Sequence, residues 1–420
     1  MRVNILFLPL LLGAISFNDI QKEITNSFKY KIAKTNVEIY KEKLKIAKSK
    51  LYGKITLNYQ ATHLFSNPYS NITIPSLGTS KIELSKNNYV GSIVYSYPIF
   101  SGFLITSLIS KSKLELIKSK LELENVKREL ILNSAKIYSD IYAINANINA
   151  LKEAKKALFI SYEKAKYFYK ENLINKSELD EIEAKYYELK ANIKELEAKK
   201  EALINTLSYL INKQIKDIST VKVKKETFNP NFQNRADIKA IRLTLNIKDK
   251  DILIAKSKLY PQVALQVGIK KEANNVWLNR NEFQNVDKSF IGVGIEYSFD
   301  LGIKPSIEIA KKAKLNAYMF YNDYLNKIKT DYNNDLALYK ALFVNLNAVN
   351  KEIKARKSYY DLIQAKFNEG LVDSVKLNEA ISKLAISKSK KEAIKAKIFF
   401  LNVKLKLNGG ESWKIFKKSF

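Results

Sequence analysis

The sequence has no cysteine and a single histidine, His63. The lack of cysteine excludes a disulfide framework, a thiolate metal site and a lipid-bearing cysteine behind a signal segment. A lone histidine near a predicted loop is far more often a bystander than a catalytic base or a metal ligand. Carboxylates are plentiful, but those between Glu178 and Glu183 stand at helical spacings with lysines, as solvated ion pairs do. We therefore predict no enzymatic activity and no cofactor.

Glycine and proline are also scarce, with 12 and 7 in 420 residues. Because these residues mark most turns, the elements between turns must be long, and long helices are expected. Beyond residue 17 there is no run of 18 apolar residues. This excludes membrane-spanning helices in the rest of the chain.

The N-terminus, MRVNILFLPLLLGAISF, has a cationic start at Arg2, an apolar run from Ile5 to Leu12, and small residues at Ala14 and Ser16. This pattern is typical of a secretory signal peptide, predicted over residues 1–16. An N-terminal membrane anchor is the alternative, but the apolar run is too short to cross a bilayer. We therefore expect an exported protein.

The formal charge of +30 raises the alternative of a nucleic-acid-binding protein. The lysines are spread over both halves of the chain, however, and no recognition helix or glycine-rich phosphate loop accompanies them. Lysine placed on solvated helix faces explains the charge without a nucleic-acid partner.

The heptapeptide IAKSKLY occupies residues 46–52 and returns at residues 254–260. A breaker follows each copy, Gly53 in the first and Pro261 in the second. Beyond each breaker, apolar residues take every second position, which is typical of a strand with two different faces. We interpret the heptapeptide as the point in each duplicated half where a helix gives way to a strand.

Each half contains two such alternating stretches. Any one of them alone could equally be a half-buried strand of a soluble sheet. The segments between the stretches, roughly 64–88 and 271–288, are polar and are predicted to be exposed loops. The four stretches are Ile55–Ala61, Ile93–Ile99, Val263–Ile269 and Ile291–Phe299.

Long helices with a seven-residue period follow the strand pairs. They are predicted from about residue 102 to 170 and from about 305 to 368, each roughly 100 Å long at 1.5 Å per residue. Such a strict heptad imposes a left-handed supercoil. The apolar positions are Ile109, Leu116, Leu123, Leu130, Ile137, Ile144, Leu151 and Leu158, then Tyr318, Leu325, Tyr332, Tyr339, Leu346, Ile353, Tyr360 and Phe367.

Both long helices end in a similar tip, Glu171-Asn172-Leu173 in the first half and Glu369-Gly370-Leu371 in the second. Asn and Gly best tolerate the left-handed conformation that closes a helix, so a helical hairpin is predicted at each tip. The resulting organisation is a first repeat over residues 17–211, a polar linker over 212–230, a second repeat over 231–408 and a short tail over 409–420.

Four strands cannot close a barrel, because the smallest membrane barrels have about eight. Open strand edges in lipid would leave backbone groups unsatisfied, so the chain must join identical copies. Three copies would supply twelve strands. The expected fold is mainly α with β: long helices forming a periplasmic α-barrel, and four strands per chain contributing to a trimeric transmembrane β-barrel.

The order of these features resembles the TolC-type outer-membrane efflux proteins, the outer membrane factor family. The resemblance rests on the handover Ala255–Pro261, the motif YPIFSG at Tyr97–Gly102, the two tips and the duplication. It implies a homotrimer in the outer membrane whose helices extend into the periplasm. It also implies a periplasmic adaptor and an inner-membrane pump as partners, and a passive conduit for small molecules or exported polypeptides.

The resemblance also assigns candidate sites. The tips Glu171, Asn172, Leu173, Glu369, Gly370 and Leu371 correspond to adaptor-docking turns. The acidic ring of the family's tunnel entrance falls on Lys376 and Glu379, so a double acidic ring is not reproduced, while the first half offers Glu178 and Glu181 at the same spacing. The family's proline before Phe299-Asp300 is missing. A periplasmic coiled-coil scaffold or adaptor is the alternative function, although it has no need of four alternating strands.

Overall fold

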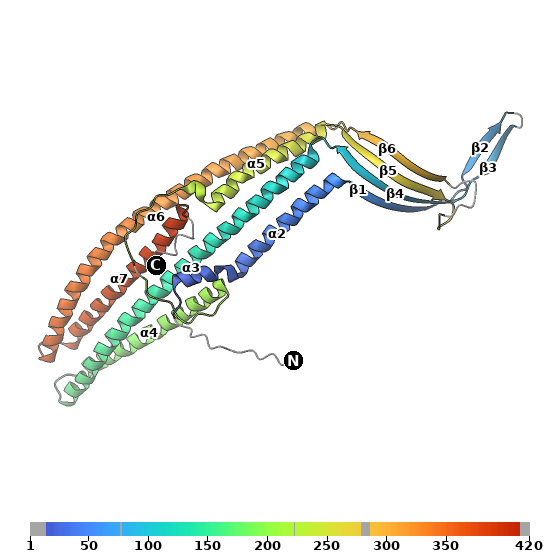
Figure 1. Ribbon diagram of the computed structural model, residues 1–420. Coiled ribbons are helices and arrows are strands. Elements are labelled where there is room, and N and C mark those ends of the chain that lie inside the picture. Colours follow the sequence, from blue (N-terminus) through green and yellow to red (C-terminus); the bar gives the residue numbers. More distant parts are fainter. Residues whose placement is uncertain (1–13, 76–77, 222, 279–285, 412–420) are drawn as a thin grey trace, which may run out of the picture. The chain divides into compact units, whose positions relative to one another are not determined.

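The computed structural model describes residues 14–75, 78–221, 223–278 and 286–411. Figure 1 shows the described chain as long helices interrupted by strands. The helices are α1 (Phe17–Glu23), α2 (Phe28–Ser49), α3 (Leu104–Lys170), α4 (Lys176–Ile211), α5 (Ala236–Lys256), α6 (Ile303–Asn368) and α7 (Ser374–Asn408). The strands are β1 (Lys54–His63), β2 (Tyr69–Ile74), β3 (Gly78–Glu83), β4 (Asn87–Phe100), β5 (Gln262–Ala273) and β6 (Val286–Glu296).

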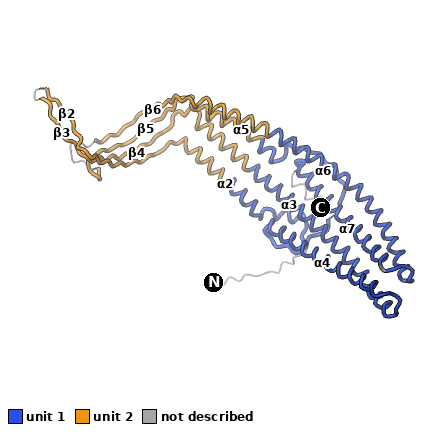
Figure 2. The backbone as a smooth tube through the Cα atoms, turned by 180° about the vertical axis from the view of Figure 1, so that it is seen from behind, with its two compact units in different colours: residues 1–36, 120–241, 321–420 blue, residues 37–119, 242–320 orange. Residues whose placement is uncertain are grey.

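The chain divides into two compact units (Figure 2). We call residues 1–36, 120–241 and 321–420 the helical unit, and residues 37–119 and 242–320 the sheet unit. Helices α2, α3, α5 and α6 contribute residues to both units, whereas all strands belong to the sheet unit. No described helix is long and apolar enough to cross a membrane.

Most of the predicted signal peptide, residues 1–13, and most of the predicted tail, residues 412–420, lie outside the described residues. The backbone N–H of Ile15 donates to the carbonyl oxygen of Asp217 at 2.9 Å. The side chain of Ser16 caps α1 by accepting a hydrogen bond from the backbone N–H of Asp19. Phe17, the first residue after the predicted cleavage position, is buried. Cleavage after Ser16 stays a prediction.

The four predicted strands form one antiparallel sheet in the order β1-β4-β5-β6. The two halves of the sequence therefore meet where β4 pairs with β5. Among the described residues, β1 pairs only with β4 and β6 only with β5, so each has one open edge. The register of β4 on β5 shifts between Pro98 and Phe100, as expected where a proline removes a backbone donor.

Several strand ends differ from the sequence prediction, and β4 begins at Asn87, six residues before the predicted stretch. β5 extends to Ala273 and β6 begins at Val286, so both enter the segment 271–288 that was predicted to be a loop. β6 ends at Glu296 rather than Phe299. Glu296 pairs with Gln262, the first residue of β5. Pro261, which precedes Gln262, has no backbone N–H to donate, so the residues after Glu296 have no strand partner on β5.

The first predicted loop, 64–88, is not a simple loop, because β2 and β3 form a separate two-stranded hairpin within it. On one face, the hydroxyls of Thr73 and Thr79 hydrogen-bond across the strands at 2.9 Å, and the ammonium of Lys81 lies over the ring of Tyr69. Figure 1 shows this hairpin beyond the end of the four-stranded sheet. Its polar cross-strand pairs stabilise a hairpin that has no apolar alternation strong enough to predict it.

The twin heptapeptide adopts the same structure twice, which confirms the predicted handover. α2 ends at Ser49 and a 3₁₀ turn over Lys50–Tyr52 leads to Gly53. α5 ends at Lys256 and a 3₁₀ turn over Ser257–Leu259 leads to Pro261. The last turn of each helix tightens before the chain enters its strand.

We expect Gly53→Ala to lower the free energy of unfolding of the sheet unit by more than about 2 kcal/mol. Gly53 has a φ of +76°, and a Cβ there would lie 2.4 Å from the carbonyl oxygen of Ser96. Gly292 in the same sheet has open space around its Cβ position, so Gly292→Ala is the matched control and should cause no loss. Thermal unfolding of the purified variants measures the difference; equal midpoints for the two would contradict it.

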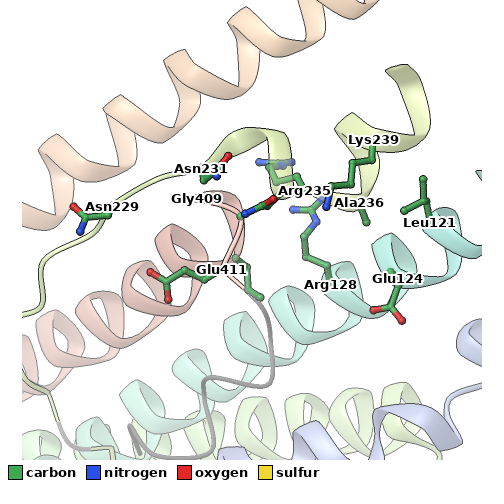
Figure 3. Close-up of a pocket in the computed structure, with 13 residues that line it drawn as sticks. Leu121, Glu124, Arg128, Asn229, Asn231, Arg235, Ala236, Lys239, Gly409 and Glu411 are labelled. Atoms are coloured by element: carbon green, nitrogen blue, oxygen red, sulfur yellow. The ribbon is translucent and has the colours of Figure 1, made fainter. Parts of the chain in front are cut away.

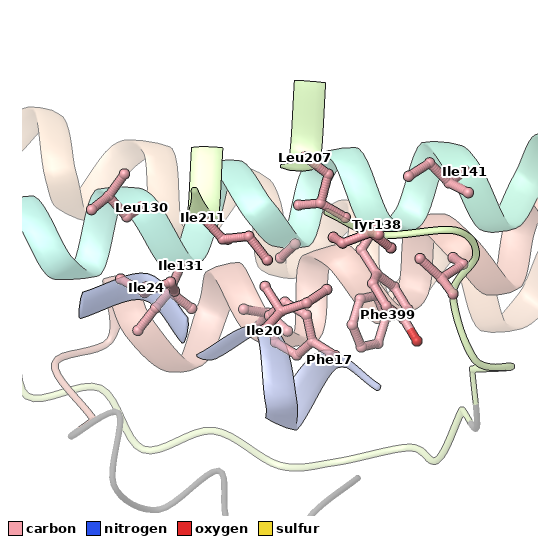
Figure 4. Packing of buried hydrophobic residues seen from close by; sticks show 14 of the residues in the cluster. Phe17, Ile20, Ile24, Leu130, Ile131, Tyr138, Ile141, Leu207, Ile211 and Phe399 are labelled. Atoms are coloured by element: carbon pink, nitrogen blue, oxygen red, sulfur yellow. The ribbon is translucent and has the colours of Figure 1, made fainter. Parts of the chain in front are cut away.

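The main core of the helical unit gathers α1, α3, α4 and α7 (Figure 4). Phe17, Tyr138 and Phe399 form its aromatic centre, with ring centroids 5.2–5.6 Å apart. The predicted linker, 212–230, contains no helix or strand among its described residues, yet Ile215 and Ile218 are buried in this core. The segment is therefore part of the packing and not only a polar connection.

Two buried tyrosines hold the linker against the long helices. The hydroxyl of Tyr138 on α3 donates to the carbonyl oxygen of Ser219 at 2.8 Å. The hydroxyl of Tyr339 on α6 accepts from the backbone N–H of Glu226 at 3.0 Å. Each repeat thus binds part of the linker with a tyrosine from its own long helix.

The heptad prediction agrees with the burial of the two long helices. All eight predicted positions on α3 are at least partly buried, as are seven of the eight on α6. The exception is Tyr318, whose side chain is 53% exposed.

Candidate functional site

The four-stranded sheet has one apolar face that nothing in the described chain covers. In the middle of the sheet, Tyr95 pairs with Ile55 on one side and with Val267 on the other, and Val267 pairs with Ile291. Exposed apolar side chains continue along every strand of this face. They are Ile55, Leu57, Tyr59, Ile93, Tyr95, Tyr97, Val267, Ile269, Ile291, Val293 and Ile295.

The opposite face of the same sheet is mainly polar, because side chains alternate along a strand. Its central level consists of Thr56, Val94, Gly268 and Phe290, and the levels on either side carry serine, asparagine, glutamine and lysine. Apolar patches larger than a few hundred Å² on monomers usually mark contact with a partner or a membrane. The sheet is therefore built to separate an apolar medium from water.

The two tips have matching backbone geometry, as predicted. Asn172 has a φ of 58° and Gly370 a φ of 75°. The N–H of Leu173 donates to the carbonyl oxygen of Phe168 at 2.9 Å, and that of Leu371 to the carbonyl oxygen of Lys366 at 2.9 Å. These bonds close the ends of α3 and α6 in the same left-handed motif.

Capping residues begin the returning helices in the same way. The side chain of Asn175 accepts a hydrogen bond from the N–H of Glu178, and that of Asp373 from the N–H of Lys376. Between the closing and the capping motifs, the side chains of Leu173 and Leu371 are both 67% exposed. Each hairpin thus presents one apolar side chain to solvent at a fixed position.

A cavity of about 460 Å³ lies between the two tips, which are adjacent within the helical unit (Figure 1). Lys164 links the hairpins, because its ammonium donates to the carbonyl oxygen of Asn368 at 3.1 Å. The same ammonium lies 5.1 Å from the ring centroid of Phe168 and 5.3 Å from that of Phe367. The residues that line the cavity are Ala165, Phe168, Leu173, Ile174, Glu178, Ile182, Phe367, Gly370, Leu371, Val372 and Asp373.

The four candidate entrance residues do not form one cluster in this chain. Glu178 lines the cavity between the tips and is half-buried, whereas Glu181 and Lys376 are exposed. Glu379 is exposed and forms an ion pair with Lys383 one turn along α7. The hydrogen bond and the charge of Lys383 lower the pKa of the Glu379 carboxyl. Within one chain, each of the four side chains therefore contacts its own helix or solvent, and they do not form a ring.

Sequence reasoning missed a buried ionic cluster at the start of α5, and Figure 3 shows its two arginines, Arg128 and Arg235, at the edge of a cavity. Arg235 donates to both carboxylate oxygens of Asp237, at 3.1 and 2.6 Å, and Arg128 of α3 donates to the same carboxylate at 3.2 Å. The side chains of Arg235 and Asp237 are 5% and 6% exposed. Both arginines also bond to Asn408 at the end of α7, and the hydroxyl of Tyr324 on α6 donates to Asp237, so the cluster joins four helices.

A signal for this cluster was present in the composition. Only 6 of the 72 cationic residues are arginine. Guanidinium binds a carboxylate in a rigid two-pronged geometry that ammonium cannot match, so the few arginines of a lysine-rich chain are the first candidates for buried pairs. Arg128 and Arg235 line a cavity of about 960 Å³. Because both guanidinium groups donate hydrogen bonds to Asp237 and Asn408, we assign the cluster a structural role.

No protein-family model and no curated protein sequence matches this chain. Solved structures do. The CmeC outer membrane channel of Campylobacter jejuni shares 18% identity with a TM-score of 0.79, covering 94% of this chain and 85% of that chain. The outer-membrane channel OprN shares 14% identity with a TM-score of 0.78, covering 95% and 90%.

The outer membrane protein VceC of Vibrio cholerae shares 16% identity with a TM-score of 0.74, covering 94% of this chain and 96% of that chain. At such identities the likeness concerns the fold, and it extends over nearly the whole described chain. The protein therefore has the TolC-type fold of these outer-membrane channels, as the order of its sequence features predicted.

Proposed function

We propose that this protein is the outer-membrane channel of a tripartite efflux or type I secretion system, a passive conduit with no enzymatic activity. The observation that carries the proposal is the four-stranded sheet with one uncovered apolar face, one polar face and two open edges. In lipid the open edges would leave backbone groups without partners. Pairing β6 of one copy with β1 of the next removes both edges.

The strand directions fit this closure. Every neighbour in the order β1-β4-β5-β6 is antiparallel, so β1 and β6 run in opposite directions and a β6–β1 contact between copies is antiparallel as well. Three copies give a closed barrel of about twelve strands, wide enough for a water-filled interior. The apolar face then contacts outer-membrane lipid and the polar face lines the lumen. We therefore propose a homotrimer.

The tips are the proposed docking surface for a periplasmic adaptor, which connects the channel to an inner-membrane pump. The support is that two hairpins of different sequence hold an exposed leucine in the same backbone motif. Glu171 and Glu369 stand two residues before these leucines and give each tip an acidic rim. A leucine at this position commonly packs on the last turn of its own helix, but at 67% exposure most of each leucine stays accessible to a partner.

We expect Leu173→Ser and Leu371→Ser each to weaken adaptor binding about tenfold, because each removes an apolar anchor at the centre of the docking surface. Lys170→Ser is the matched control, since it shortens an exposed side chain of the same hairpin without removing an apolar contact. Co-purification of the adaptor encoded nearby with the tagged channel gives the measurement. Unchanged recovery with both leucine variants would exclude the tips as the docking surface.

Planar-bilayer recording of the purified protein tests the proposed function itself. A channel gives a stable conductance, while a protein that carries no current under any condition is not a duct. Membrane fractionation separates the remaining alternative, because a periplasmic scaffold is released by a high-salt wash and a barrel protein needs detergent.

A further inference from the structure

The polar face of the sheet carries two lysines side by side. Lys270 of β5 pairs directly with Lys288 of β6, and both alternate onto the face opposite Ile269 and Ile291. The same level continues through the small polar residues Ser92 and Asn58 on β4 and β1. Like charges directly opposite each other in a ladder are destabilising, so this placement has a cost in stability.

The positive charge of this level is only partly neutralised. The carboxylate of Glu272 lies 3.3 Å from the ammonium of Lys270 and also accepts a hydrogen bond from the side-chain amide of Asn88 at 3.0 Å. Lys288 forms no ion pair within the described part of the chain. The other charged side chains of this face, Lys54 and Glu296, stand at other levels, nearer the helices.

We propose that Lys270 and Lys288 form a cationic belt inside the barrel that favours anionic solutes over cationic ones. The inference rests on the proposed function, because it needs the polar face to line a lumen. Each copy adds two lysines to this level and one glutamate, Glu272, to the neighbouring level, so every copy leaves one net positive charge over the two levels. A ring of one sign inside a pore attracts counter-ions and raises their local concentration.

The position of the belt strengthens its effect. The level adjacent to the lysines, on the side of the helices, carries Val94, Gly268 and Phe290, which supply no charge. An ion that moves from the belt toward the helices therefore meets no opposite charge at the next level of the sheet. Charge in a pore acts over roughly the Debye length, about 30 Å at 0.01 M salt and about 10 Å at 0.1 M.

The test is the chloride-to-potassium permeability ratio, obtained from the reversal potential of single channels in a KCl gradient at low salt. We expect the double variant Lys270→Gln/Lys288→Gln to lower this ratio at least about twofold. Lys271→Gln is the matched control, because Lys271 is the next residue on β5, points to the opposite face and pairs with Asp287 at 3.5 Å. It should leave the ratio unchanged.

A second variant moves the ratio in the other direction. Glu272→Gln removes the carboxylate that pairs with Lys270 and should raise the chloride preference, while an amide oxygen can still accept the hydrogen bond from Asn88. A conducting double variant with an unchanged ratio, or equal effects of Lys270→Gln/Lys288→Gln and Lys271→Gln, would overturn the belt and leave the channel function intact. Absence of any conductance in the unmodified protein would instead overturn the channel.

Discussion

Replacing Val267 by lysine is expected to abolish assembly of the channel. Val267 is exposed in the middle of the apolar face, between Tyr95 on β4 and Ile291 on β6. A lysine facing lipid near the bilayer centre costs roughly 2–4 kcal/mol per copy, and every copy of the ring carries it. Heat-resistant oligomers on gels of unboiled samples, together with the amount of protein in the outer-membrane fraction, measure the loss.

The matched control is the next residue toward the N-terminus. Gln266 pairs with Ser96 and Gly292 on the polar face, so Gln266→Lys places the same charge in water at the same depth. We expect this variant to assemble normally. Equal loss for the two variants would mean that both faces of the sheet contact the same medium, which contradicts a barrel in lipid.

Asp237→Asn is expected to lower the free energy of unfolding of the helical unit by about 3–5 kcal/mol. The substitution removes the carboxylate that Arg235 and Arg128 share and leaves two guanidinium groups in a buried site. It also weakens the hydrogen bond from the hydroxyl of Tyr324 at 3.0 Å. Thermal unfolding followed by circular dichroism gives the measurement.

A control and a pH arm make this result specific. Asp249, also on α5, pairs with Lys314 at 2.6 Å, but both side chains are more than 40% exposed, so Asp249→Asn should cost less than about 1 kcal/mol. Burial raises the pKa of the Asp237 carboxyl, but Arg235 and Arg128 outweigh it and hold the pKa below its ordinary value. Its stabilising effect is therefore present above the pKa of the unfolded carboxyl and is lost as the pH falls through the lower folded pKa.

The unmodified protein should accordingly be more stable than the Asp237→Asn variant at all pH values except in strong acid, where the difference disappears. A difference between the two proteins that disappears already near neutral pH would show that the carboxylate is not charged in the folded state, or that the loss comes from elsewhere.

Local signals were enough to predict much of this structure. The change from helix to strand depends on a helix-ending sequence followed by Gly53 or Pro261. Both signals act within a few residues of the chain. The tips depend on Asn172 and Gly370, whose left-handed backbone is a property of those residues. The seven-residue period of α3 is sustained long enough that tertiary contacts cannot override it.

The features that sequence reasoning missed depend on contacts between distant residues. Arg128 and Asp237 meet only because α3 and α5 lie together, and Ile218 is buried because the linker crosses the helices. The hairpin of β2 and β3 is held by polar pairs such as Thr73 and Thr79, which resemble loop composition in a single sequence. The paired lysines of the polar face required the register of β5 on β6.

The two open edges also set a rule for how assembly stops. The sheet has two different edges, β1 at one side and β6 at the other, so copies add head to tail. Every copy added to a growing arc exposes the same two edges again. No particular side chain terminates the series, so only the bend of the sheet decides when the last edge meets the first. Copy number is then a property of curvature, and the irregular register beside Pro98 becomes a place where a single substitution could change the stoichiometry or produce open polymers.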